Sequence, residues 1–183
     1  MIKGIIFDMI GPLLQKCHDY VSDEIVETAE NMRSCSLNDE EFIQALKKNE
    51  ITEQYSLDEI AKRIVSKYCK VQQVWDKLLP KLKSKYKLGI INNGTAITIS
   101  HFKEKNKSNE FFTTFINSSE VNIEKPNSRI YILTAEQMKL KPEECVFIDD
   151  TEKNVLGANN VGMKGLLFTN YQNLLIDLKA LNI

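Results

Sequence analysis

The chain has 183 residues, with 43% hydrophobic and 27% charged residues, which fits one ordinary globular domain with a modest insertion. Its formal net charge of −1 gives no electrostatic reason to expect binding to nucleic acid or to an anionic membrane. The cysteines, Cys17, Cys35, Cys69 and Cys145, lack the Cys-x-x-Cys spacing of a zinc site, and we expect reduced thiols in a cytoplasmic protein. The first apolar stretch is short and ends at Asp8, so it predicts neither a signal peptide nor a membrane span.

The first predicted element is a buried strand over residues 2–8, and a long helical region follows it. Because apolar residues recur there at helical spacing without a strand pattern between them, we expect a compact all-helical unit over residues 15–72. The apolar stripe of its last helix runs on to Tyr68. The helices predicted in this unit are residues 19–33, a segment opening at the capping pattern Asn38-x-x-Glu41, and a segment opening at Ser56-x-x-Glu59.

From residue 73 onward, helices and strands alternate, starting with a helix that begins or bends at Pro80 and finishing with a C-terminal helix. Strands are predicted at 87–91, 114–116, 144–148 and 165–168, and helices at about 96–106, from Lys125-Pro126 onward, and near 155–161. This alternation predicts an α/β fold with a Rossmann-like three-layer core, in which helices cover both faces of a mainly parallel five-stranded sheet. The core would comprise residues 1–14 and 73–183, and residues 15–72 would form a small α-helical cap.

Polar residues stand where three of the predicted strands end. Asp8 ends the first strand, residues 92–94 follow the second core strand, and Asp149-Asp150 end a third. Because the carboxyl ends of parallel strands meet at one edge of a sheet, we expect these residues to share a site. Clustered carboxylates raise one another's pKa, and a hard divalent cation such as Mg²⁺ removes that cost. The alternative is that Asp149-Asp150 only caps the helix that begins near Thr151.

Two further groups near the same edge fit a phosphate site. The amides of Asn92 and Asn93 could donate hydrogen bonds to a phosphate oxygen, and Gly94 would allow close approach of the backbone. The alternative is a turn, which Asn-Gly also favours. Lys125 could neutralise a nucleophilic carboxylate or a bound phosphate, whereas most lysines in loops are simply solvated.

Supporting residues are predicted in one core helix and in the cap. Asn154 should lie in the first turn of its helix, where it could orient the acidic pair or Lys125, or be an ordinary surface amide. Arg33 and Arg63 are candidates for contact with an anion from the cap side. The sequence gives no prediction of the oligomeric state.

Four segments in this order resemble the motifs of haloacid dehalogenase-like (HAD) hydrolases that carry a small helical cap after the first core strand. They are Ile5–Leu13, Leu88–Gly94, Glu124–Tyr131 and Val146–Asn154, with Ala158 and Gly162-Met163 after the last. The resemblance implies that Asp8 is a nucleophile that forms an aspartyl intermediate, that Lys125 steadies it, and that the Asn92 side chain binds phosphate. It also implies Mg²⁺ held by Asp8, by the backbone carbonyl of residue 10 and by Asp150, with Asp149 acting through water or through another ligand.

The chain departs from the family pattern at three positions. Ile10 stands where the family has its acid/base aspartate, Pro12 where it commonly has threonine, and Asn92 where it has serine or threonine. Any residue supplies a carbonyl, so the metal site survives Ile10, but protonation of the leaving group does not. General acid–base catalysis is typically worth about 10²–10⁴ in rate, or roughly 3–5 kcal/mol. Alkyl phosphates would therefore suffer most, and acyl or aryl phosphates least.

The sequence favours a Mg²⁺-dependent phosphatase or phosphotransferase that acts on a small phosphorylated molecule through Asp8. Two alternatives stay open. A metal-independent dehalogenase fits Ile10, although the retained Asp149-Asp150 pair is costly without a metal. A binding or regulatory protein that kept the scaffold and lost turnover fits Ile10 together with Pro12.

Overall fold

The computed structural model describes residues 1–36 and 38–183 and is built on a sheet of five parallel strands. The strand order is β5-β4-β1-β6-β7, which places β1 between β4 and β6 at the centre. The prediction of a parallel five-stranded sheet is confirmed. The strands are β1 (Gly4–Asp8), β4 (Lys87–Asn92), β5 (Thr114–Asn117), β6 (Cys145–Asp149) and β7 (Lys164–Leu167).

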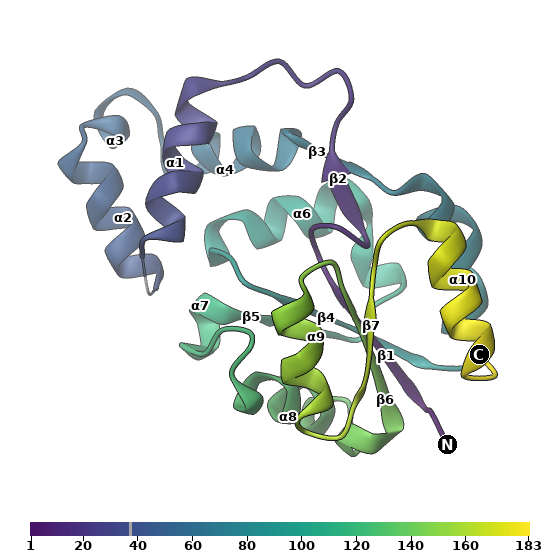
Figure 1. The fold of residues 1–183 in the computed structure, drawn as a ribbon. Coiled ribbons are helices and arrows are strands. Elements are labelled where there is room, and N and C mark those ends of the chain that lie inside the picture. Colours follow the sequence, from purple (N-terminus) through teal and green to yellow (C-terminus); the bar gives the residue numbers. More distant parts are fainter. Residues whose placement is uncertain (37) are drawn as a thin grey trace.

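Helices cover both faces of this sheet, as successive strand residues point to opposite sides. Phe7 and Ile90 belong to a core cluster with residues of the π-helix η1, α5, α6 and α10, whereas Ile6 and Ile91 pack with α8 and α9 (Figure 1). The Rossmann-like three-layer arrangement is therefore confirmed. The elements are η1 (Val74–Leu78), α5 (Leu79–Lys83), α6 (Ile99–Asn106), α8 (Ser128–Gln137), α9 (Glu152–Asn159) and α10 (Tyr171–Ala180), with short α7 (Ser118–Val121), η2 (Ala96–Thr98), η3 (Ser108–Glu110) and η4 (Pro142–Glu144) between them.

A separate group of helices, here called the cap, lies beyond the carboxyl ends of the strands (Figure 1). Its helices are α1 (Glu24–Ser34), α2 (Asp39–Lys48), α3 (Ile51–Gln54) and α4 (Leu57–Ser66). They enclose their own hydrophobic cluster, which includes Ala29, Phe42 and Ile60. Both predicted helix starts are present: the Asn38 side chain accepts a hydrogen bond from the Glu41 amide, and Ser56 and Glu59 form a reciprocal capping box.

Two short strands join the cap to the core, so the prediction of an all-helical unit over residues 15–72 is wrong at both ends. β2 (Leu14–Lys16) pairs antiparallel with β3 (Tyr68–Lys70). Tyr68 therefore lies in a strand, and α4 stops at Ser66. Three residues are too few for an alternating pattern to be visible, and each strand finds its partner far away in the sequence.

Two helices begin later than predicted because unrecognised caps set their starts. Asp23 accepts hydrogen bonds from the amides of Ile25 and Val26, so α1 starts at Glu24 instead of residue 19. Asn127 caps α8, which leaves Pro126 outside the helix that it was expected to open. Pro80 does lie in the first turn of α5, as predicted.

The prediction of four reduced thiols is wrong for two of them. Cys17 and Cys69 form a disulfide, with Cα atoms 5.0 Å apart; Cys69 lies within β3, and Cys17 directly follows β2. The two cysteines are 52 residues apart in the sequence, and the antiparallel pairing of β2 with β3 brings them together. Cys35 and Cys145 are free thiols. The argument for a cytoplasmic location from reduced cysteines therefore no longer holds, and no helix among the described residues is long and apolar enough to cross a membrane.

Candidate active site

Asp8 lies at the carboxyl end of the central strand and is only 9% exposed. Its Oδ1 accepts a hydrogen bond of 2.6 Å from the Met9 amide and lies 2.7 Å from the Nζ of Lys125. Burial raises the pKa of Asp8 to about 7, against the lowering effect of the Lys125 ammonium, and the charge of Asp149 adds to the rise. A further cation near this carboxylate would favour its ionised form.

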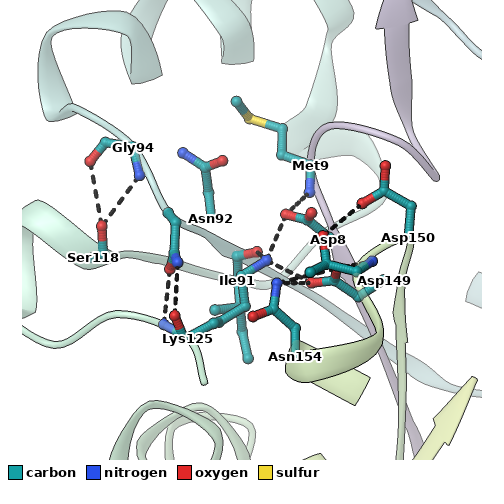
Figure 2. Close-up of polar contacts among 12 residues, drawn as sticks. Asp8, Met9, Ile91, Asn92, Gly94, Ser118, Lys125, Asp149, Asp150 and Asn154 are labelled. Atoms are coloured by element: carbon teal, nitrogen blue, oxygen red, sulfur yellow. Dashed lines mark hydrogen bonds and ion pairs between the residues drawn. The ribbon is translucent and has the colours of Figure 1, made fainter. Parts of the chain in front are cut away.

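Lys125 is buried between two carboxylates, with 2% exposure (Figure 2). Besides its contact with Asp8, its Nζ lies 2.8 Å from Asp149 Oδ2 and donates to the Ile91 carbonyl at 3.3 Å. The Asn93 side chain holds the backbone of Lys125 in both directions, because its Nδ2 donates to the Lys125 carbonyl and its Oδ1 accepts from the Lys125 amide. Lys125 is thus fixed at both ends and is not a solvated loop lysine.

Asp149 is fully buried and has several partners, whereas its neighbour Asp150 is exposed. The Thr151 amide donates to Asp149 Oδ1 at 2.8 Å, and Asn154 Nδ2 lies 3.2 and 3.1 Å from the two Asp149 oxygens. Asn154 is buried and contacts Asp149, so it is not the ordinary surface amide of the alternative prediction. Burial raises the pKa of Asp150, and the charge of Asp149 adds to this effect.

Gly11 makes room for Asp150. Its φ of +104° is a conformation that side-chain-bearing residues rarely adopt, and a Cβ placed there would lie 2.6 Å from both Cγ and Oδ2 of Asp150. The turn after β1 and the end of β6 thus approach each other without an intervening side chain.

The acidic residues at this edge fit a divalent cation. Asp8, Asp149 and Asp150 each present a carboxylate oxygen, and these oxygens lie within 4.8 Å of one another. Burial raises the pKa values of Asp8 and Asp150, and the charge of Asp149 adds to both rises, so a bound cation would favour the ionised form of each carboxylate. Oxygen ligands of this kind suit Mg²⁺. Ile10, whose backbone carbonyl is the remaining predicted ligand, lines the same cavity as Asp8 and Asp150.

The second predicted group, residues 92–94, is held by two residues that the sequence analysis did not identify. Asn92 Nδ2 donates to Asn117 Oδ1 at 2.7 Å, and the Gly94 amide donates to Ser118 Oγ at 3.1 Å. A Cβ on Gly94 would lie 2.3 Å from Asn92 Nδ2, so Gly94 leaves space for that side chain. Asn117 ends β5 directly beside Asn92 at the end of β4, and this shared position at a strand end was the available signal.

Two adjoining cavities open at this edge of the sheet. One of about 330 Å³ is lined by Asp8, Lys125 and Asp150, together with Lys153 and Asn154. The other, of about 430 Å³, lies between the cap and the core. Residues that line both cavities are Ile10, Asn92 and Asn93. A molecule with its reactive group at Asp8 would therefore extend past Ile10 toward the cap.

The two candidate arginines of the cap have different surroundings. Arg63 forms an ion pair of 2.7 Å with Asp23, within the cap. Arg33 lines the larger cavity and reaches the core, where its Nη2 donates to the Gly94 carbonyl at 3.0 Å.

Comparison with known proteins places this geometry in a family. Residues 5–168 match the family model described as haloacid dehalogenase-like hydrolase. The chain is similar to a HAD-family enzyme of Bacteroides thetaiotaomicron that was solved in complex with magnesium and inorganic phosphate. The TM-score is 0.71 at 21% identity, over 96% of this chain and 99% of that one.

The similarity to two curated proteins covers only part of their length. A glyceraldehyde 3-phosphate phosphatase of Methanothermobacter thermautotrophicus is 40% identical over 90 residues, which are 47% of this chain and 39% of that protein. An (S)-2-haloacid dehalogenase of Pseudomonas putida is 30% identical over 86 residues, which are 45% of this chain and 38% of that protein. The chain thus spans less than half the length of each of these relatives.

Proposed function

The chain belongs to the haloacid dehalogenase-like hydrolase family, and from this premise we propose that it is a Mg²⁺-dependent phosphatase or phosphotransferase for a small phosphorylated molecule. The observation that carries the proposal is the Asp8 carboxylate, held at a strand end by Lys125 and lining a cavity with Asp150. The phosphatase relative and the neighbour solved with magnesium and phosphate support it.

Asp8 is the proposed nucleophile. Both contacts with Met9 and Lys125 engage Oδ1, which leaves Oδ2 to attack phosphorus. The bond from phosphorus to the leaving oxygen breaks as the aspartyl phosphate forms, and the leaving group takes the bonding electrons. Lys125 positions Asp8 and favours its ionised form against the effect of burial, and Asn92, which lines the same cavity, is the proposed donor to the phosphate. Water then attacks the phosphorus of the aspartyl phosphate and regenerates Asp8.

We propose that Asp8 and Asp150 hold Mg²⁺ directly with the carbonyl of Ile10, and that Asp149 acts through its neighbours. When bound, the ion would offset the charge of the carboxylates and of the incoming phosphate. Asp149 is already engaged by Lys125, Thr151 and Asn154, which suits a residue that orients the site instead of binding the ion itself.

Ile10 favours substrates that are esters or anhydrides with good leaving groups. An isoleucine side chain cannot donate a proton to the leaving oxygen, so that oxygen must depart as a stable anion or be protonated by water. The same absence slows the attack of water on the aspartyl phosphate. We therefore propose that acyl and aryl phosphates react faster than alkyl phosphates, and that the phosphorylated protein accumulates during turnover.

The test compares acetyl phosphate, 4-nitrophenyl phosphate and glycerol 3-phosphate, with and without Mg²⁺, for the wild type, Asp8→Asn and the exposed control Asp19→Asn. Phosphate release should follow that order of substrates, require Mg²⁺, fall to background in Asp8→Asn and persist in Asp19→Asn. Acid quenching should trap phosphate on the wild type and not on Asp8→Asn.

Two other outcomes would replace the proposal. Release of chloride from 2-chloropropionate without Mg²⁺ would identify the dehalogenase alternative, which the dehalogenase relative also makes worth testing. Background rates for every substrate, equal in the wild type and Asp8→Asn, would identify a binding or regulatory protein.

A further inference from the structure

Arg33 is a cation at the substrate cavity that lacks a negatively charged partner. It lies in the last turn of α1 and lines the cavity of about 430 Å³ between the cap and the core. Its guanidinium donates to the carbonyls of Ser36 and Gly94, at 2.7 and 3.0 Å, and to Ser118 Oγ at 3.4 Å. These acceptors are all neutral, and in residues 1–36 and 38–183 no carboxylate lies within ion-pair distance of Arg33.

The Nε of Arg33 is also unsatisfied. It is buried and has no hydrogen-bond partner. Leaving a charged donor buried without an acceptor is costly, so such groups normally have a partner. Arginine presents its donors as a planar fork that matches a carboxylate or a phosphate, which makes an anion the natural complement of this group.

Arg33 differs from the neighbouring charged residues of the cap, which have partners of opposite charge. In the cap, Arg63 pairs with Asp23, and Lys67 pairs with Glu27 and Glu30. Glu30 lines the same cavity as Arg33, but Lys67 and the Tyr68 hydroxyl already bind its carboxylate. Its charge is therefore compensated within the protein, whereas the charge of Arg33 is not.

The cavity around Arg33 continues past Ile10 into the cavity of Asp8. A leaving group that extends from a phosphate at Asp8 past Ile10 would enter the cavity that Arg33 lines. Building on the proposed phosphatase function, we infer that Arg33 binds a second anionic group on the leaving-group side, so that the substrate is a phosphorylated molecule carrying a carboxylate or another phosphate there.

The experiment uses substrates that differ in charge but hardly in shape. They are 3- and 4-carboxyphenyl phosphate, the matching carbamoylphenyl phosphates, and 1,4-phenylene bisphosphate for a second phosphate. The wild type should prefer the carboxylate or the second phosphate over the carboxamide by roughly 10- to 100-fold in kcat/KM, the range expected for one charge-assisted hydrogen bond. Whether the carboxylate or the bisphosphate is preferred identifies the anion.

The same ratio is then measured in Arg33→Gln and in Arg63→Gln, a control arginine of the cap that pairs with Asp23. The preference should fall to near unity in Arg33→Gln and persist in Arg63→Gln. An equal loss of turnover for carboxylate and carboxamide in Arg33→Gln would mean that Arg33 only fixes the cap against Gly94, and it would overturn the inference. Absence of any preference in the wild type would overturn it as well.

Binding measurements separate this inference from the proposed function. Calorimetry with 4-carboxybenzylphosphonate and its carboxamide reports the Arg33 contact without turnover. Preferential binding of the carboxylate, lost in Arg33→Gln, would support the inference even if no ester were hydrolysed. Turnover of phosphate esters with equal binding of the two phosphonates would leave the phosphatase intact and refute the role of Arg33.

Discussion

Replacing Lys125 with methionine would leave Asp8 and Asp149 without the ammonium group that lies 2.7 and 2.8 Å from their oxygens. Methionine has a similar length and volume, so the loss is chiefly electrostatic and little cavity forms. Removing one partner of a buried charge pair typically costs about 3–5 kcal/mol. Partial protonation of Asp8, whose pKa is about 7, will relieve some of this cost near neutral pH. We therefore expect a loss of about 3 kcal/mol in the free energy of unfolding at pH 8, which for a chain of this length lowers Tm by roughly 6–12 °C.

The measurement is urea unfolding at pH 8, followed by the fluorescence of the single tryptophan, Trp75, which is buried in the core. The matched control is Lys153→Met, because Lys153 lines the same cavity but is exposed, and its loss should change stability by no more than about 0.5 kcal/mol. Mg²⁺ should recover part of the loss in Lys125→Met if the carboxylates hold the ion. A Lys125→Met protein as stable as Lys153→Met would refute the reasoning that Lys125 compensates buried charge.

Three further predictions concern the same edge of the sheet. Ile10→Asp should raise the turnover of alkyl phosphates by up to about 10²–10⁴ over the wild type, while Ile10→Asn should not. Equal turnover of alkyl phosphates by the two variants would show that a step other than protonation of the leaving group limits the rate. Gly11→Ala should abolish the shift in Tm that Mg²⁺ causes, because its Cβ meets Asp150, whereas Gly162→Ala has a similar φ of +91° in open space and should keep that shift. In metal-free protein the raised pKa of Asp8 contributes stability below about pH 4 that is lost as the pH rises through about 7, so the wild type should lose more stability between pH 5 and 8 than Asp8→Asn. Parallel urea midpoints for these two proteins would contradict that assignment.

The parts of the molecule that could be predicted are those that a continuous stretch of sequence specifies by its pattern of apolar and polar residues. The apolar runs that end at Asp8 and Asp149 fixed two central strands and brought their carboxylates to one edge, because parallel strands share a direction. Local pattern alone did not distinguish Lys125 from other loop lysines; its order among the four motifs did.

Features that depend on contacts between residues far apart in the sequence could not be predicted. Asn117 stands at the end of a predicted strand, but it meets Asn92 only because β5 pairs beside β4 in one register, which the sequence does not specify. The β2–β3 pair and the Cys17–Cys69 bond likewise arise from two segments separated by the whole cap. Such contacts follow from the packed fold and not from the sequence window around either partner.

The disulfide also shortens the covalent path between the paired strands β1 and β4. Strands β1 and β4 are paired, Gly4 facing Lys87, although the cap separates them by roughly 80 residues. Through the Cys17–Cys69 bond the covalent path between these two residues shortens to roughly 30 residues, which lowers the entropic cost of closing that loop by about 0.9 kcal/mol. The entropic cost of pairing β1 with β4 then no longer depends on the number of residues between Cys17 and Cys69, so the cap can vary in length without making this pairing harder to form.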